Sequence, residues 1–151
     1  MDRLLERDAR CVTVLDVSAS ALARAKSRLG DAQRRVTWIQ ADVTSEWHVE
    51  PVDVWHDRAV FHFLTDAEER TRYMDRLRAT VRAGGTAILA TFAPDGPKKC
   101  SGLPVQRYDA TALQAELGAG FALVGTQHEE HRTPAGAVQS FCYAAFRRDH
   151  P

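Results

Sequence analysis

The chain has 151 residues, of which 44% are hydrophobic and 26% are charged, and its formal net charge at pH 7 is +0. This composition predicts one globular domain spanning 1–151 and gives no electrostatic footprint for nucleic acid. No apolar run approaches the length that crosses a membrane, and the three cysteines form neither a disulfide framework nor a zinc pattern. We expect a protein of the reducing cytoplasm, without a nucleic-acid or membrane partner. The arginine- and alanine-rich composition is typical of a GC-rich bacterial genome.

The segment 11–30, CVTVLDVSASALARAKSRLG, organises the first part of the chain. Its β-branched and apolar run, which ends at Asp16, predicts an inner strand of a parallel sheet. Ser18 is a favourable helix N-cap, apolar residues follow at helical spacing, and Gly30 is suited to end the helix. Ligands of open α/β sheets bind beyond the carboxyl ends of the strands. Asp16 is therefore placed either to accept hydrogen bonds from ribose hydroxyls or merely to help cap the helix.

Two more strands are expected before residue 60. Residues 2–10 are compatible with the last turns of a helix. The segment 36–41, VTWIQA, predicts a second strand that stops at the acid Asp42. The segment 52–57, VDVWHD, predicts a third strand, which continues into RAVFHFL. Each of the three strands therefore ends at or beside an aspartate.

A second helix and the rest of the chain continue this alternation. Thr65 and Glu68 form a T-x-x-E capping box, which predicts the start of a helix. The buried stripe of this helix is expected at Met74, Leu77 and Val81. Its end is expected at Gly84 and Gly85. The remaining elements are expected as a strand at 86–92, a long loop at 93–108, a short helix at 109–117 and strands at 121–128 and 138–147.

The last two strands decide the fold class. Only about nine residues, 129–137, separate them, whereas a parallel crossover needs a dozen or more. They should therefore be antiparallel, while the earlier alternation of strands and helices implies parallel, right-handed connections. We predict an α/β fold with a Rossmann-like, doubly wound, mostly parallel sheet and an antiparallel terminal strand pair.

These segments, in this order, resemble the class I S-adenosylmethionine-dependent methyltransferases from the second strand of that fold onward. LDVSASAL resembles the motif whose acid binds the cofactor ribose, a role that would fall on Asp16 with Val17 beside it. QADV resembles the motif whose acid contacts the adenine amino group, which would be Asp42 with Val43. RAGGTAILATF resembles the helix end and fifth strand. The resemblance implies S-adenosyl-L-methionine as cofactor, with His56 near it.

The catalytic candidates follow from the same resemblance. VDVWHDRAVFHFL resembles the fourth-strand motif, which faces the methyl group and the substrate. Asp57 and Arg58 resemble the Asp-Arg pair of thiopurine-type small-molecule methyltransferases, in which the arginine helps to place the substrate; alternatively, the two residues pair with each other and fix the turn. His62 is a candidate general base or a histidine packed between phenylalanines. The implied partner is a small-molecule acceptor.

The amino-terminal end departs from the family pattern. The family begins with a strand and a glycine-rich loop whose amides approach the cofactor closely, but no glycine precedes Gly30. We expect an N-terminally truncated fold, from a misplaced start site or a truncated gene. Alternatively, the chain is a non-catalytic remnant or interaction module that cannot hold the cofactor. The strands at 12–17 and 52–57 would expose unpaired edges, which favour pairing with each other or in a homodimer.

Two other clusters contain residues that can carry chemistry. In the loop 93–108, where the family often builds a substrate lid, Cys100 follows two lysines and is either a reactive thiol or a small buried residue. The run of His128, Glu129, Glu130 and His131 falls on an expected loop with no fixed helical face, which favours solvated charge over a ligand set. We expect no metal.

Overall fold

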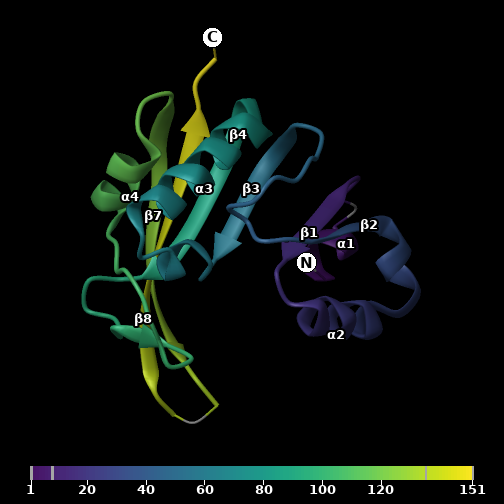
Figure 1. Cartoon of the computed structure of the whole chain (residues 1–151), viewed down its shortest axis with the longest axis horizontal. Helices are drawn as coiled ribbons and strands as arrows, with labels where there is room; N and C mark the ends of the chain where they lie inside the picture. The colour runs from purple at the N-terminus through teal and green to yellow at the C-terminus, as the bar shows by residue number, and fades with distance from the viewer. Residues whose placement is uncertain (1, 8, 135, 151) are drawn as a thin grey trace. The chain divides into compact units, whose positions relative to one another are not determined.

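The computed structural model describes residues 2–7, 9–134 and 136–150 (Figure 1). The chain divides between Trp47 and His48 into two compact units, and each is described by itself. The first unit holds α1 (Asp2–Glu6), β1 (Val12–Asp16), α2 (Ala19–Leu29), a 3-10 helix (Gly30–Arg35) and β2 (Val36–Gln40). The second unit holds β3 (Val52–Arg58), a 3-10 helix (Phe61–Phe63), α3 (Ala67–Thr80), β4 (Val81–Phe92), β5 (Lys99–Cys100), β6 (Leu103–Pro104), α4 (Ala110–Leu117), β7 (Phe121–Arg132) and β8 (Val138–Arg148).

The first unit is a parallel strand pair joined by a helix. β1 pairs in parallel with β2, and their register runs from Val12 opposite Val36 to Asp16 opposite Gln40. The side chain of Ser18 accepts a hydrogen bond from the Ala21 N–H at 3.2 Å, so Ser18 is the N-cap of α2. Gly30 ends α2 with a φ of 54°, a conformation that costs glycine little. The predicted strand, N-cap and helix end are confirmed.

The second unit is built on a four-stranded sheet in the order β3-β4-β8-β7. β3 and β4 are parallel, whereas β8 is antiparallel to both β4 and β7. The short connection after β7 therefore returns the chain as a neighbouring antiparallel strand, as its length predicts. In the described part of the chain, β3 pairs only with β4. The mixed α/β fold with a terminal antiparallel pair is confirmed.

The boundaries of α3 differ from those predicted. Asp66, not Thr65, is the N-cap: its Oδ1 accepts hydrogen bonds from the N–H groups of Glu68 at 2.9 Å and Glu69 at 3.1 Å. The helix ends at Thr80, before the glycines, because the chain continues directly into β4. Gly85 serves a close approach instead, since a Cβ there would meet the backbone oxygen of Arg82 at 2.8 Å.

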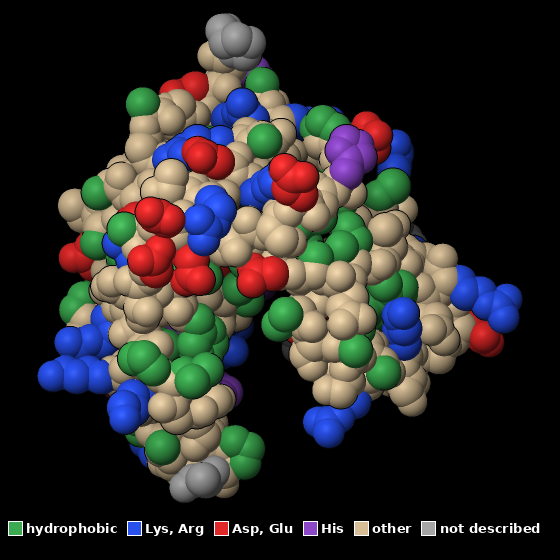
Figure 2. Space-filling view, viewed as in Figure 1, with side chains coloured by type: hydrophobic (Ala, Val, Ile, Leu, Met, Phe, Trp, Pro, Cys, Tyr) green, Lys and Arg blue, Asp and Glu red, His purple; other side chains and the backbone are tan. Residues whose placement is uncertain are grey.

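The core of the second unit lies between the sheet and two helices. α3 and α4 contact each other and the sheet (Figure 1). Fully buried residues of this core include Tyr73, Met74, Leu77, Leu89, Leu113, Leu117 and Phe146. Burial of each such leucine contributes about 1.5–3 kcal/mol, which fixes the helices against the strands. The side chains on the face shown in Figure 2 include acidic and basic groups side by side. Among the described residues, no helix is long and apolar enough to cross a membrane.

Candidate functional site

The carboxyl ends of β1 and β2 carry the two predicted cofactor acids. Oδ1 of Asp16 accepts a hydrogen bond from the Ser18 N–H at 2.8 Å. No N–H or O–H group in the described chain donates to its second oxygen, Oδ2. The pairing of β1 with β2 extends one residue beyond Gln40, because the backbone oxygen of Asp16 accepts a hydrogen bond from the Ala41 N–H at 3.3 Å. The local turn therefore occupies one oxygen of the carboxylate, and the other oxygen accepts no hydrogen bond from the described residues.

Asp42 stands directly beyond that last strand contact. Its Oδ1 accepts hydrogen bonds from the Thr44 N–H at 2.8 Å and from the Thr44 hydroxyl at 2.7 Å. The backbone oxygen of Val43 accepts a hydrogen bond from the Trp47 indole N–H at 3.1 Å. Val17, after Asp16, is 68% exposed. The two acids and their flanking valines thus lie in ordered turns after neighbouring parallel strands, where α/β proteins bind ligands.

Asp57 is the centre of a buried turn at the carboxyl end of β3. Its Oδ1 accepts from the Val60 N–H at 2.9 Å, and its Oδ2 accepts from the Phe61 N–H at 2.9 Å and from the Tyr73 hydroxyl at 2.6 Å. Burial raises the pKa of this carboxyl, and the three hydrogen bonds oppose that shift. The contacts of both oxygens serve the turn and its anchor on α3.

The same turn contains a left-handed residue that is not glycine. Ala59 has a φ of 66°, and its N–H donates to the backbone oxygen of Ala90 at 2.8 Å. This conformation costs an alanine about 1–2 kcal/mol, so it persists because neighbouring contacts impose it. Those contacts are the pairing with β4 on one side and the Asp57 carboxylate on the other. The position of Arg58 between them is fixed as a result.

Arg58 does not pair with Asp57. Its Nε donates to the Tyr143 hydroxyl at 2.8 Å, and its guanidinium carbon lies 4.5 Å from the centroid of the Phe141 ring. Both partners belong to β8. His56 precedes Arg58 by two positions on β3, so the two side chains share a face of the sheet. Arg58 is exposed, and these two contacts orient its planar guanidinium.

His62 is fully buried in the segment that follows. Its Nδ1 accepts a hydrogen bond from the Phe92 N–H at 3.4 Å, which assigns the proton of the neutral ring to Nε2. Nε2 has no partner in the described part of the protein. Burial lowers the pKa of His62 to about 4. The ring is neutral at physiological pH and its one lone pair is engaged, so these contacts favour packing over proton abstraction.

The loop after β4 is ordered and carries a short hairpin. β5 and β6 are antiparallel, and the two residues between them, Ser101 and Gly102, have φ values of 49° and 83°. Two positive values are the signature of a type I′ hairpin turn. Cys100 is half-buried within this hairpin and forms no disulfide. Near the start of this loop, Asp95 Oδ1 accepts a hydrogen bond from the Ser140 hydroxyl at 2.8 Å. The same hydroxyl hydrogen-bonds His128 Nε2 at 2.6 Å, so the loop is tied to the β7–β8 pair.

Two tyrosines were missed at the sequence level. Tyr73 lies one helical turn before Leu77 on the buried face of α3, so its helical spacing was a usable signal. Tyr143 had none, because its contact with Arg58 joins residues 85 positions apart. Among the described residues, no three histidine, cysteine or acidic side chains gather as a metal-binding group.

Comparisons with known proteins identify the family and the fold of the chain. A family model described as "Methyltransferase domain" matches residues 1–85. The N-methyltransferase NodS from Bradyrhizobium japonicum WM9 superposes with a TM-score of 0.72 at 18% identity, over 91% of this chain and 73% of that chain. A methyltransferase from Methanosarcina mazei gives a TM-score of 0.75 at 13% identity, over 100% of this chain and 88% of that one.

A third structure contains both ligands of a methyl transfer. The Burkholderia thailandensis 1,6-didemethyltoxoflavin-N1-methyltransferase, with bound 1,6-didemethyltoxoflavin and S-adenosylhomocysteine, gives a TM-score of 0.72 at 22% identity. It is matched over 99% of this chain and 65% of its own. At such identities the structures establish a common fold. A search of the curated proteins finds no match.

Proposed function

Because this chain belongs to the class I S-adenosylmethionine-dependent methyltransferases, through the methyltransferase-domain family that matches residues 1–85, we propose that it methylates a small molecule. The observation that carries the proposal is the carboxylate of Asp16. It stands at the carboxyl end of β1, two residues before the N-cap of α2, with one oxygen in the local turn and the other without a partner among the described residues.

These residues fit the nucleoside part of the cofactor. A carboxylate oxygen accepts hydrogen bonds from ribose hydroxyls, and Asp16 has one to offer. Asp42 would accept from the adenine amino group, with Val17 and Val43 beside the base. S-adenosyl-L-methionine, when bound, supplies an electrophilic methyl group on a sulfonium sulfur. The work left to the protein is to hold the acceptor in line with that methyl group.

Arg58 is the residue that we assign to the acceptor. Its guanidinium is held by Tyr143 and lies against Phe141, and such a preorganised planar fork orients an acceptor without a large loss of side-chain freedom. Asp57 fixes the turn on which Arg58 stands and is therefore a positioning residue. His62 supports the same segment as a neutral ring. The small molecule bound in the Burkholderia structure supports an acceptor of that size.

Calorimetry with S-adenosyl-L-methionine tests the cofactor assignment. The Asp16→Ala variant should bind the cofactor roughly tenfold or more weakly, since a hydrogen bond to a charged group contributes about 1.5–3 kcal/mol. The matched control is Asp31→Ala, which removes an exposed acid of the same unit near the opposite, amino end of β2. Equal affinities of the wild type and the Asp16→Ala variant would refute the assignment. Absence of any binding by the wild type would favour an interaction module without a cofactor.

A further inference from the structure

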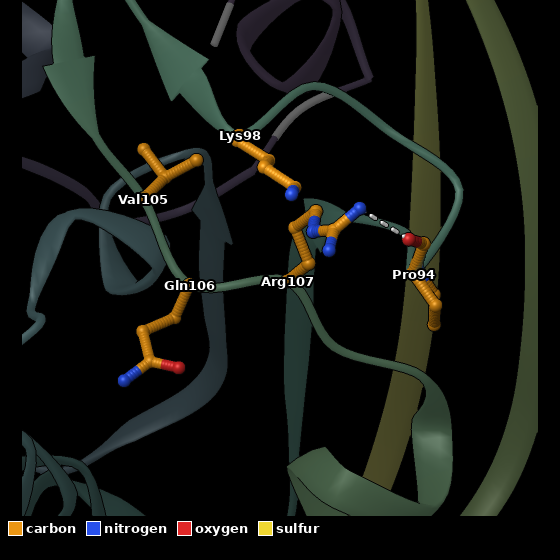
Figure 3. Close-up of a pocket in the computed structure, with 5 residues that line it drawn as sticks. All are labelled: Pro94, Lys98, Val105, Gln106 and Arg107. Carbon is orange, nitrogen blue, oxygen red and sulfur yellow. Dashed lines mark hydrogen bonds between the residues drawn. The ribbon is translucent and has the colours of Figure 1, made fainter.

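The loop between β4 and α4 forms a pocket. The pocket has a volume of about 350 Å³ and is lined by Pro94, Lys98, Val105, Gln106 and Arg107. Figure 3 shows the Lys98 ammonium and the Arg107 guanidinium directed toward the same space, while the Gln106 amide points away from it. No acidic side chain lines the pocket. Its lining therefore carries two positive charges that face one region.

Backbone hydrogen bonds hold the walls of this pocket in place. The Val105 N–H donates to the Lys98 oxygen at 3.2 Å, so the two sides of the loop are joined. The Gln106 N–H donates to the His62 oxygen at 2.8 Å, which ties the pocket to the segment after β3. Gly96 is buried, and a Cβ there would meet the Ser140 oxygen at 2.7 Å, so the loop packs closely against β8. The arrangement is ordered before any ligand arrives.

Arg107 is positioned by carbonyl groups and not by a carboxylate. Its Nη1 donates to the backbone oxygen of Pro94 at 2.5 Å (Figure 3). The same nitrogen donates to the backbone oxygen of Gly96 at 3.2 Å. The remaining nitrogens of the fork keep their donors. Preorganised arginine donors favour planar carboxylate and tetrahedral phosphate oxygens. An anion that enters the pocket thus meets a donor set that needs little reorganisation.

The charges of the pocket are not neutralised by the protein around it. Among the described residues, no carboxylate lies within ion-pair distance of Lys98 or Arg107. The acid nearest to Lys98 along the chain, Asp95, is engaged by the Ser140 hydroxyl and lies 3.7 Å from His128 Nε2. Two cations that face one space repel each other, and an anion between them reverses the sign of that interaction. The pocket is therefore electrostatically complementary to an acidic group.

The location of the pocket relates it to the methyl acceptor. The loop leaves the carboxyl end of β4, and its Gln106 joins the segment that follows Arg58 at the carboxyl end of the parallel strand β3. We propose that this pocket binds an acidic group, a carboxylate or a phosphate, of the methyl acceptor. This inference rests on the proposed function, and it narrows the acceptor to an anionic small molecule.

Anion titration of the full chain, without cofactor, tests the pocket directly. Amide signals of ¹⁵N-labelled protein are followed by NMR during addition of sodium phosphate in one arm and sodium benzoate in the other, at constant ionic strength. We expect saturating shifts at residues 98 and 105–107, with the tighter-binding arm identifying the acidic group. Lys98→Gln should weaken this binding at least about fivefold, as expected for the loss of one charge-assisted contact.

Lys99→Gln is the matched control, because Lys99 is the exposed neighbour of Lys98 and does not line the pocket. It should change the affinity less than about twofold if binding is local. Arg107→Lys keeps the charge and should still weaken binding, because it loses the fork. Equal losses of anion affinity in Lys98→Gln and Lys99→Gln, or amide shifts spread over exposed basic residues, would show diffuse electrostatic attraction. Either result would overturn the assignment of anion binding to this pocket.

Turnover measures whether the bound anion belongs to the acceptor. Carboxylate acceptors are compared with their neutral carboxamide analogues, and we expect a preference for the acid that Lys98→Gln abolishes and Lys99→Gln retains. An equal kcat/KM for acid and amide overturns the link to the acceptor. Failure of the proposed function has a different signature: calorimetry finds no binding of S-adenosyl-L-methionine. Phosphate shifts at 98 and 105–107 would then define an anion pocket unrelated to methyl transfer, which also overturns that link.

Discussion

Acidification should destabilise the folded protein through His62. Burial lowers the pKa of this ring to about 4, against an ordinary value of 6.5 that applies to the unfolded chain. Between these values the unfolded chain binds a proton that the folded protein does not, so the stabilising contribution is present above pH 6.5 and lost as the pH falls. From about pH 7.5 to about pH 5, the loss is about 2 kcal/mol, and it reaches about 3 kcal/mol near pH 4.

Urea unfolding at a series of pH values measures this loss against a variant that cannot titrate. His62→Asn retains an acceptor for the Phe92 N–H, because the amide oxygen replaces Nδ1, but it has no proton to gain in this range. Carboxyl groups elsewhere contribute equally to both proteins and cancel in the difference. The wild type should lose about 2 kcal/mol more than the variant by about pH 5.

An exposed histidine provides the control for this experiment. The side chain of His48 is 89% exposed, so His48→Asn should follow the wild-type pH dependence. Identical slopes for the wild type and His62→Asn would refute the reasoning, since the ring would then titrate alike in the folded and unfolded states. NMR titration of the His62 ring gives its folded-state pKa independently.

Three further substitutions test the turn after β3. Tyr73→Phe should lower the free energy of unfolding by about 1.5–3 kcal/mol in urea, because the buried Asp57 loses a donor; an unchanged midpoint would contradict this. Ala59→Gly should raise that free energy by up to about 1 kcal/mol by relieving the left-handed strain, whereas Ala59→Val should lower it. Arg58→Lys should raise the acceptor KM while calorimetry finds cofactor affinity within about twofold of wild type, since the charge stays but the fork is lost; equal losses of both would indicate a structural role.

The parts of the fold that the sequence predicted well are those with local signals. The strand, N-cap and helix of 11–30 are specified by neighbouring residues. The connection expected at 129–137, which the structure shortens to 133–137, is too short for a parallel crossover. The cap of α3 was misassigned because both Thr65 and Asp66 are capping residues, and the carboxylate of Asp66 reaches two amides. The pair of glycines was misread as a helix end because composition does not distinguish a helix terminus from a close approach within a strand.

The candidate site was less predictable, because its contacts join distant residues. The sequence indicated Asp16 and Asp42 through their places after strands. It did not indicate that Asp57 would accept from Tyr73, or that Arg58 would turn to Tyr143 instead of its neighbour. The pocket of Lys98 and Arg107 also depends on the fold of a loop, where spacing carries little information. The roles of Asp57, Arg58 and His62 in catalysis, and that of His56 near the cofactor, stay predictions.

The hairpin of β5 and β6 makes the loop between β4 and α4 exchangeable. The loop starts and finishes against the same strand end, since the Ala93 N–H donates to Ser140 of β8 and the Tyr108 N–H to Phe92 of β4. Its type I′ turn at Ser101 and Gly102 lies away from these anchors along the chain. Each doubling of a flexible loop costs only about 0.6 kcal/mol. Grafts of new hairpins between the anchors would therefore change the shape and charge of this loop while leaving the sheet intact, which makes this segment the place to diversify in a library that tests the proposed acceptor pocket.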